Sequence, residues 1–278
     1  MPNVENTLSR MWKVGVWLTV GFLVVNILAM IASVLVNSFA TRWLGTWLPK
    51  GFTVRWYFSA WKEFQLTDVM IVTFEIAAAV VVLSILLGVP AAYALARREF
   101  PGKRIVMLLF LLPLLVPPIT FGVPLATVLY RYGLAGQMTG VILANLVPTV
   151  PFTVVLLIPF IEQIDPRVES AARVFGANTF KLFTHIVVPL LIPGILAATL
   201  IVMIRTVSMF ELTFLTAGPT SQTLVVALYY SVFAAGVRAG QSIDAMAVIY
   251  MLSTLFWLII ALRFVNPTQI VGRVKNKA

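Results

Sequence analysis

Three ionisable side chains lie inside long apolar runs of this 278-residue chain: Glu75, Arg205 and Glu211. A charged side chain at the centre of a membrane helix costs roughly 2.5–3.5 kcal/mol on insertion scales, so such residues are candidates for function. Asn145, a polar but uncharged residue inside the fourth apolar run, is a weaker candidate. Arg205 and Glu211 do not share a face of a straight helix. Two interpretations stay open for Arg205: an ion pair that holds helices together, or a place on a solute pathway.

Other reactive chemistry is scarce in the sequence. His185 is the only histidine and there is no cysteine, which excludes disulfides, thiolate or histidine-cluster metal sites and cysteine nucleophiles. The sequence contains no recognisable pair of catalytic residues and no G-x-x-x-x-G-K-[ST] phosphate loop. We therefore expect no catalytic residue, no metal site and no cofactor on this chain.

The composition indicates a membrane protein. With 60% hydrophobic and 11% charged residues, the chain is too apolar for an ordinary soluble domain. Apolar runs of about twenty residues predict helices that cross a bilayer. The first run is too long for a cleavable signal and is expected to be retained. We predict an all-α membrane protein with six spans, at about residues 14–36, 69–96, 105–130, 138–160, 188–214 and 244–265.

Proline is concentrated in the third and fourth predicted spans. Because proline lacks an N–H and clashes with the preceding helical turn, we expect these spans to be kinked or locally broken. Irregular packing and a cavity between bent helices both stay open as interpretations. The residues are Pro113, Pro117, Pro118, Pro124, Pro148, Pro151 and Pro159.

Basic residues beside the spans predict the orientation. With the N-terminus inside, the inner segments hold most of the 20 Lys and Arg residues, so both termini are predicted to be cytoplasmic. Basic residues that cluster beside the spans as orientation signals account for the net charge of +10, and no nucleic-acid partner is expected. The inner residues are Arg10, Lys13, Arg97, Arg98, Lys103, Arg104, Arg167, Arg173, Lys181, Arg263, Arg273, Lys275 and Lys277.

We predict three parts along the chain. Residues 1–65 form an N-terminal membrane helix and a periplasmic aromatic-rich connection, 66–265 form a core with five spans, and 266–278 form a basic cytoplasmic tail. Within 215–243, the run LVVALYYSVFAA is too short to span and predicts an interfacial or re-entrant helix. The aromatic anchors of the first connection are Trp43, Trp47, Trp56, Tyr57 and Trp61.

A polar, glycine-punctuated loop at about 161–189 joins the fourth and fifth spans. Asp165 and Pro166 suit the N-cap and first position of a helix, and Glu169 suits its positive end. Gly176 is placed to end this helix, and Asn178 to cap the next one. The pattern predicts two short helices joined by a bend. They are either an ordinary cytoplasmic loop or a docking element for a soluble partner.

The second short helix carries an apolar pattern. Phe180, Phe183 and Val187 lie at helical spacing, which predicts one apolar stripe. Pro189 is expected at the start of the fifth span.

The same loop resembles the signature of binding-protein-dependent ABC transporter permeases, which reads Glu-Ala-Ala, then Gly, then Ile-x-Leu-Pro. Ser170 occupies the Glu position, although Glu169 is one residue earlier, and Val188 replaces the Leu. The resemblance covers about residues 66–265. It implies a type I ABC importer permease fold in the bacterial cytoplasmic (inner) membrane, and import as the direction. The matching residues are Ala171, Ala172, Gly176, Ile186 and Pro189.

In that family the motif loop forms coupling helices that sit in a cleft of an ATPase subunit. The resemblance implies two ATPase subunits carrying ATP and Mg, a periplasmic solute-binding protein and a second, similar permease, since six spans form half of a pathway. Arg173 and Lys181 can pair with acidic groups on a partner. The ATPase-coupling candidates are Glu169, Ser170, Ala171, Ala172, Arg173, Gly176, Lys181, Ile186 and Pro189.

The stretches GFTVRWY, residues 51–57, and SMFELTFLTAGPTSQTL, residues 208–224, resemble the spermidine/putrescine-type branch. That branch has an acidic pair where this chain has Phe210 and Glu211. We expect Glu211, beside Thr213 and Thr216, to guide a polyamine-like or other cationic or zwitterionic solute. Ferric iron, aminoethylphosphonate and opine-like solutes are alternatives. An ion-coupled secondary transporter is the alternative of another class, and it predicts an inverted repeat that we do not find.

Overall fold

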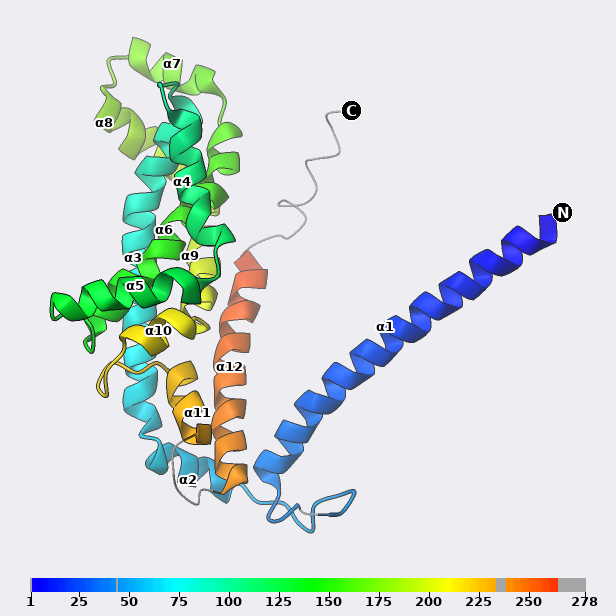
Figure 1. The fold of residues 1–278 in the computed structure, drawn as a ribbon. Coiled ribbons are helices and arrows are strands. Elements are labelled where there is room, and N and C mark those ends of the chain that lie inside the picture. The colour runs from blue at the N-terminus through cyan, green and yellow to red at the C-terminus, as the bar shows by residue number, and fades with distance from the viewer. Residues whose placement is uncertain (1, 44, 234–238, 265–278) are drawn as a thin grey trace. The chain divides into compact units, whose positions relative to one another are not determined.

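The structure is a computed structural model that describes residues 2–43, 45–233 and 239–264, with side chains from Met11 onward except that of Phe264. The chain folds as two units, which we describe separately (Figure 1). Unit 1 comprises residues 1–64 and 234–249, and unit 2 comprises 65–233 and 250–278. The predicted basic tail, 266–278, and Arg238 lie outside the described residues, and so does the side chain of Arg10.

Unit 1 is built from α1 (Pro2–Phe39), α2 (Arg55–Glu63) and the first turns of α12 (Gly240–Phe264). The first predicted span is thus one long helix. Between α1 and α2 the chain forms a narrow loop, in which the Thr41 amide donates to the Gly51 carbonyl at 2.9 Å. The Trp56 indole N–H donates to the Ala40 carbonyl at 2.7 Å and fixes α2 to the base of this loop.

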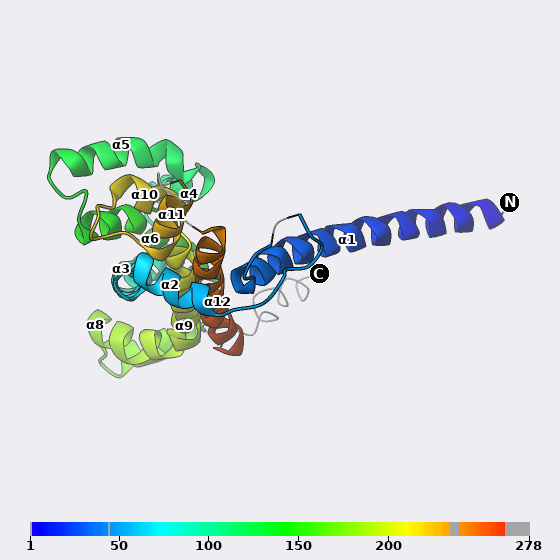
Figure 2. The ribbon, with the colours of Figure 1, turned by 90° about the horizontal axis from the view of Figure 1, so that it is seen from below.

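The core of unit 2 is formed by α3 (Leu66–Arg97), which packs against α6 (Met138–Glu162) and α9 (Val188–Val207). Small residues permit the close approach of α3 and α6: a Cβ atom added to Gly88 would lie 2.7 Å from Cγ2 of Thr153. At 1.5 Å per residue, 32 residues reach about 48 Å, which exceeds the hydrocarbon thickness of a bilayer. Seen from below, α5 (Pro118–Arg131) and α8 (Thr179–Leu182) lie on opposite sides of α3 (Figure 2).

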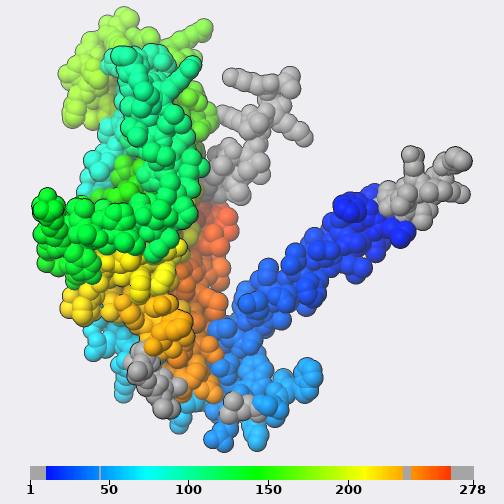
Figure 3. Space-filling view, in the orientation of Figure 1, coloured from blue at the N-terminus to red at the C-terminus, as the bar shows by residue number. Residues whose placement is uncertain are grey.

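The third predicted span is not one straight helix. It consists of α4 (Lys103–Leu115) and α5, which meet at an angle of 99°. The two prolines at 117 and 118 explain the break, because a proline forces the residue before it into an extended conformation. Val116 and Pro117 have ψ angles of 133° and 134°. In the space-filling view, residues of α4 and α5 form part of the near face of unit 2, above the yellow residues of α10 (Figure 3).

The fourth predicted span behaves differently. Here α6 runs without interruption through its three prolines, Pro148, Pro151 and Pro159, so the expected local break is absent from this helix. Pro148 and Pro151 are buried in the core, where packing against α3 and α9 holds the helical path.

The fifth predicted span is shorter than expected at its C-terminal end. Helix α9 ends at Val207, and α10 (Glu211–Thr216) begins after a break at residues 208–210. The short apolar run that follows forms α11 (Leu224–Phe233), as predicted, and α12 is the last long apolar helix. Within the described residues, five helices are long and apolar enough to cross a membrane, or six if α4 and α5 are counted as one span.

Candidate functional site

The loop between α6 and α9 has the capped helices that its sequence predicts. In α7 (Pro166–Val174) the Asp165 carboxylate accepts a hydrogen bond from the Arg167 amide at 2.9 Å, and Pro166 occupies the first turn. The helix ends at Val174, and Gly176, two residues later, has a left-handed φ of +83° that turns the chain away. The Asn178 side chain then accepts from the Lys181 amide at 2.8 Å and begins α8.

The second short helix is continuous with the fifth span, which differs from the expected arrangement. A π-helical turn, η1 (Phe183–Val187), joins α8 directly to α9. Pro189 explains the wide turn, since in an α-helix its ring would clash with the carbonyl of residue 185, four positions earlier. The residues of the expected apolar stripe differ in burial: Phe180 is 73% exposed, whereas Val187 is fully buried.

Glu169 faces the interior of unit 2. Its Oε1 lies 2.8 Å from Nε of Arg97, and its Oε2 accepts a hydrogen bond from the Tyr93 hydroxyl at 2.7 Å. The Arg97 guanidinium also donates to the Ile164 carbonyl. The Tyr93 ring contacts Phe183 edge-on, with the centroids 5.5 Å apart. These contacts fix α7 and η1 to the C-terminal end of α3.

The outer face of α7 and α8 is exposed among the described residues. Ser170, Ala171, Arg173, Gly176 and Lys181 are exposed there, while Ala172 and Ile186 are partly buried and Pro189 is exposed at the start of α9. The Ser170 hydroxyl donates to the Pro166 carbonyl at 3.1 Å.

Exposed apolar residues join this face, and we did not predict them. Val174 is 85% exposed and Phe175 is 91% exposed. The signal that would have found them is their position directly before the helix-ending Gly176, where no core is available. The face therefore combines two cations with three large apolar side chains, Val174, Phe175 and Phe180.

The charged residues predicted inside spans do not pair with one another. Among the described residues, no ion pair joins Arg205 to Glu75 or Glu211. Arg205 is exposed in the last turn of α9, and its guanidinium lies 4.4 Å from the centre of the Phe152 ring. Glu75 is exposed on α3. Glu211 is half-buried and begins α10, so it lies beyond the helix that forms the fifth span.

Asn145 is fully buried at the contact of α6 with α10. Its side-chain amide donates to the Val141 carbonyl at 2.9 Å and lies 3.4 Å from the Thr213 hydroxyl. The Oδ1 atom has no hydrogen-bond partner within the described residues. A second polar contact lies one helical turn along α6, where the Ser84 hydroxyl of α3 donates to Thr149 at 2.9 Å. Asn145 thus packs between helices within this chain.

An aromatic cluster surrounds the start of α10, and we did not predict it. Phe210 stacks on Phe214 with centroids 5.2 Å apart, and both rings contact Tyr229 of α11. Tyr229 and Tyr230 are partly exposed. Glu211 follows directly after Phe210. The sequence signal for this cluster is the aromatic residues of SMFELTF and LYYSVF. Their proximity depends on the turn between α10 and α11.

The fold shows to which class of protein the chain belongs. An all-helical chain with several apolar helices of membrane-crossing length is a multi-pass membrane protein. Residues 84–270 match the family described as "Binding-protein-dependent transport system inner membrane component". The chain therefore belongs to this family, which confirms the ABC permease expected from the sequence. It is a transport subunit and not an enzyme, and the ATPase belongs to separate subunits.

Two relatives and one solved structure illustrate the similarity. The trehalose transport system permease SugB of Mycobacterium tuberculosis is 31% identical over 193 residues, 69% of this chain and 70% of SugB. The molybdenum permease ModB of Escherichia coli is 28% identical over 62% of this chain and 82% of ModB. A bacterial ABC transporter that imports alginate has a chain with a TM-score of 0.74 and 17% identity, covering 91% of this chain and 96% of that one.

Proposed function

We propose that this chain is one permease subunit of an ATP-driven, binding-protein-dependent importer, and that α7, α8 and η1 receive the movement of an ATPase. The observation that carries the proposal is the two-sided construction of α7. Its inner side is fixed to α3 by buried Glu169, and its outer side presents Arg173 and exposed apolar side chains. A helix held in this way moves together with α3 when a partner displaces it.

The coupling roles divide between the two sides of the loop. Arg173 and Lys181 face outward and pair with acidic groups of the ATPase, and Ser170 stands beside them. Ala171, Gly176, Ile186 and Pro189 shape the surface and its connection to α9. Glu169 acts by holding α7, together with Ala172, rather than by touching the partner.

The orientation follows from the basic residues and from the length of α3. The coupling loop contacts the C-terminal end of α3, whereas α11 contacts its N-terminal half, where the Leu224 amide donates to the Thr73 hydroxyl at 2.8 Å. With the coupling loop and both termini in the cytoplasm, α11 lies toward the periplasmic side. A periplasmic binding protein then delivers the solute there, as the name of the family supports.

A second permease chain completes the pathway, and two ATPase subunits supply ATP and Mg. Glu75 and Arg205 are exposed, and neither takes part in an ion pair within the described part of this chain, which favours contact with the second permease or with solute. An ion-coupled secondary transporter would give this loop no task.

For the solute we propose a small polar molecule that contacts Glu211 and the aromatic cluster. A cationic or zwitterionic solute, such as a polyamine, is attracted both by a carboxylate and by aromatic ring faces. The names of the relatives reported above refer to trehalose and molybdenum, and thus lend the polyamine no support. A carbohydrate is the second candidate, because partly exposed aromatic rings at the Glu211 position suit sugar rings and because trehalose and alginate appear in those names.

Co-purification tests the coupling proposal. The tagged chain, extracted in mild detergent from its native cells, should retain an ATPase, a second permease and a binding protein. Phe175→Asp should release the ATPase because it places a charge on the outer face of the loop. Phe58→Asp is the matched control, since Phe58 is 69% exposed on α2 in unit 1. Equal ATPase recovery from Phe175→Asp and wild type would contradict the proposed docking face.

A further inference from the structure

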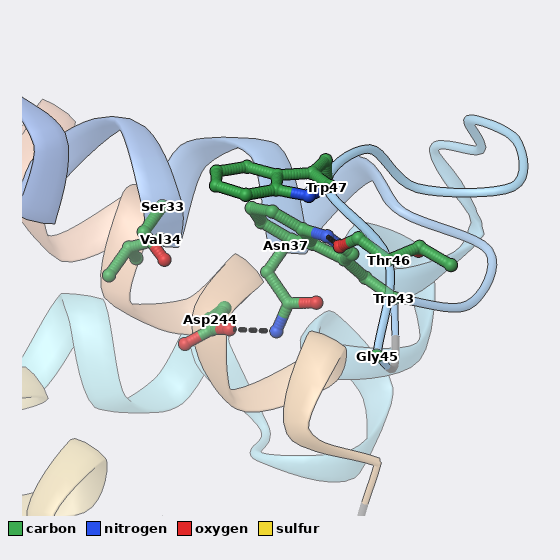
Figure 4. A pocket seen from close by; sticks show the side chains of 8 residues that line it. All are labelled: Ser33, Val34, Asn37, Trp43, Gly45, Thr46, Trp47 and Asp244. Atoms are coloured by element: carbon green, nitrogen blue, oxygen red, sulfur yellow. Dashed lines mark hydrogen bonds between the residues drawn. The ribbon is translucent and has the colours of Figure 1, made fainter.

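Unit 1 contains a cavity of about 700 Å³ between the end of α1, the loop that follows it and the start of α12. Figure 4 shows the two indole rings lying one above the other on the same side of the Asn37–Asp244 pair. The residues that carry the argument are Asn37, Trp43, Thr46, Trp47 and Asp244.

The wall of the cavity is held in place by hydrogen bonds. The Trp43 indole N–H donates to the Thr46 carbonyl at 2.8 Å. The Asn37 side-chain amide donates to Oδ2 of Asp244 at 2.5 Å, which ties α1 to α12 within unit 1. The loop is closed at its base by the bond from the Thr41 amide to Gly51. The cavity is therefore formed by the fold of unit 1.

The Asp244 carboxyl group has no cationic partner among the described residues. Its one hydrogen-bond partner within the described residues is the neutral amide of Asn37, and none of the described ion pairs includes it. Asp244 lines the cavity, and no described hydrogen bond involves its Oδ1 atom. A half-buried carboxyl group beside two apolar helices is stabilised in its charged form by a partner of opposite charge. The ligand should thus carry a cation with N–H donors.

The same loop carries cations of its own. Arg42 directly precedes Trp43 and is exposed, and the Lys50 amide donates to the Arg42 carbonyl at 3.2 Å, so both cations flank the loop. Neither takes part in a described ion pair. A carboxyl group in the cavity and two cations on the loop that borders it complement a zwitterion that bears an ammonium and a phosphate.

The surroundings are those of a membrane surface. Indole rings at the ends of apolar helices are typical of the headgroup level of a bilayer, and they attract cations. Trp47 is 98% exposed. Apolar side chains of α1, among them Leu28, Ile31 and Leu35, are exposed along the helix that leads away from the cavity. They offer a surface for acyl chains.

We propose that this cavity binds the headgroup of an aminophospholipid of the phosphatidylethanolamine type. The primary ammonium donates to Asp244, the indole rings cover it, and the phosphate faces Arg42 and Lys50. A trimethylammonium headgroup lacks the N–H donors that Asp244 accepts, so phosphatidylcholine binds more weakly.

Lipid retention in native mass spectrometry tests the proposal. The full chain, with the subunits that co-purify, is placed in nanodiscs of phosphatidylglycerol mixed with either phosphatidylethanolamine or phosphatidylcholine. We expect phosphatidylethanolamine to be retained roughly five- to tenfold more than phosphatidylcholine, and Asp244→Asn to remove this preference. Trp47→Ala should lower retention roughly two- to fivefold. Because Trp47 is exposed, its removal leaves the loop bonds intact.

Two control variants and a soluble competitor complete the test. Asp68→Asn removes an exposed acid of α3, and Trp17→Ala removes an indole that is 74% exposed on α1, and neither should alter retention. Free phosphoethanolamine, which has no acyl chains, should not displace the lipid. Equal retention of both lipids, an unchanged preference in Asp244→Asn, displacement by phosphoethanolamine, or a cross-link showing that a second permease covers Trp47 would each overturn the proposal.

Discussion

Arg97 and Glu169 form a largely buried ion pair across 72 residues of sequence, with Nε of one 2.8 Å from Oε1 of the other. The pair joins the C-terminal end of α3 to the first helix of the coupling loop. Tyr93 completes it through the second carboxylate oxygen. Glu169, which we predicted among the ATPase-coupling residues, thus faces the interior of unit 2.

Removal of either member should destabilise the chain. Glu169→Gln or Arg97→Gln leaves a buried charge without a partner, which costs about 3–5 kcal/mol. The thermal midpoint in detergent should therefore fall clearly for each variant, and the double variant should lose less than the sum. Lys103→Gln is the control, because its pair with Glu99 is exposed and worth about 1 kcal/mol or less. Strictly additive effects would contradict a direct pair.

Gly176→Val should uncouple ATP hydrolysis from uptake while the protein still reaches the membrane. A Cβ at this position meets no atom within 4 Å, so the penalty comes from the φ of +83° and amounts to about 1–2 kcal/mol. The bend between α7 and α8 then changes. The measurement is ATP hydrolysed per solute transported in proteoliposomes of the complete complex.

Gly102→Val supplies the control for that experiment. Gly102 has a φ of +84° and equally open surroundings, but it precedes α4 and lies outside the coupling loop. Wild-type coupling in Gly176→Val, or equal uncoupling in Gly102→Val, would count against a role for the bend.

Gly88→Ala should weaken the packing of α3 on α6. The new methyl group would lie 2.7 Å from Cγ2 of Thr153, and such overpacking costs about 1–3 kcal/mol. Adding Thr153→Ser removes Cγ2 and should restore part of the thermal stability. Gly15→Ala, where nothing lies within 4 Å, should leave the midpoint unchanged or slightly higher. No rescue by Thr153→Ser would disprove this contact.

Glu211→Gln should lower uptake of a cationic solute by about tenfold, which corresponds to about 1.4 kcal/mol, without loss of assembly. A neutral sugar should be affected less, because glutamine still offers hydrogen bonds. Uptake of labelled spermidine and trehalose through the purified complex measures both. Glu99→Gln, at a highly exposed side chain, is the control. Unchanged uptake of every transported solute would remove Glu211 from the pathway.

Features that depend only on residues close together in the sequence could be predicted from the sequence. Asp165, Pro166, Gly176 and Asn178 act within a few residues of themselves, and the helix ends predicted from them are confirmed. The break between α4 and α5, predicted from Pro117 and Pro118, is likewise confirmed, and the two helices together correspond to the third predicted span.

Other features depend on distant contacts. The three prolines of α6 did not break the helix, because packing decides their effect. The break at residues 208–210 contains neither proline nor glycine, so nothing in the sequence marked it. The inward orientation of Glu169 depends on Arg97, which lies on another helix. The aromatic cluster likewise depends on how α10 and α11 meet.

The π-helical turn η1 also sets the rotation of α8 about the axis of α9. A π turn corresponds to one residue inserted into an α-helix, and each residue of an α-helix turns the chain by about 100°. Deleting one residue between Phe183 and Val187 would therefore rotate α8 about the axis of α9 by roughly that amount, while leaving both helices intact. The one additional residue in the π turn thus sets the direction in which Lys181 and Phe180 point relative to α9.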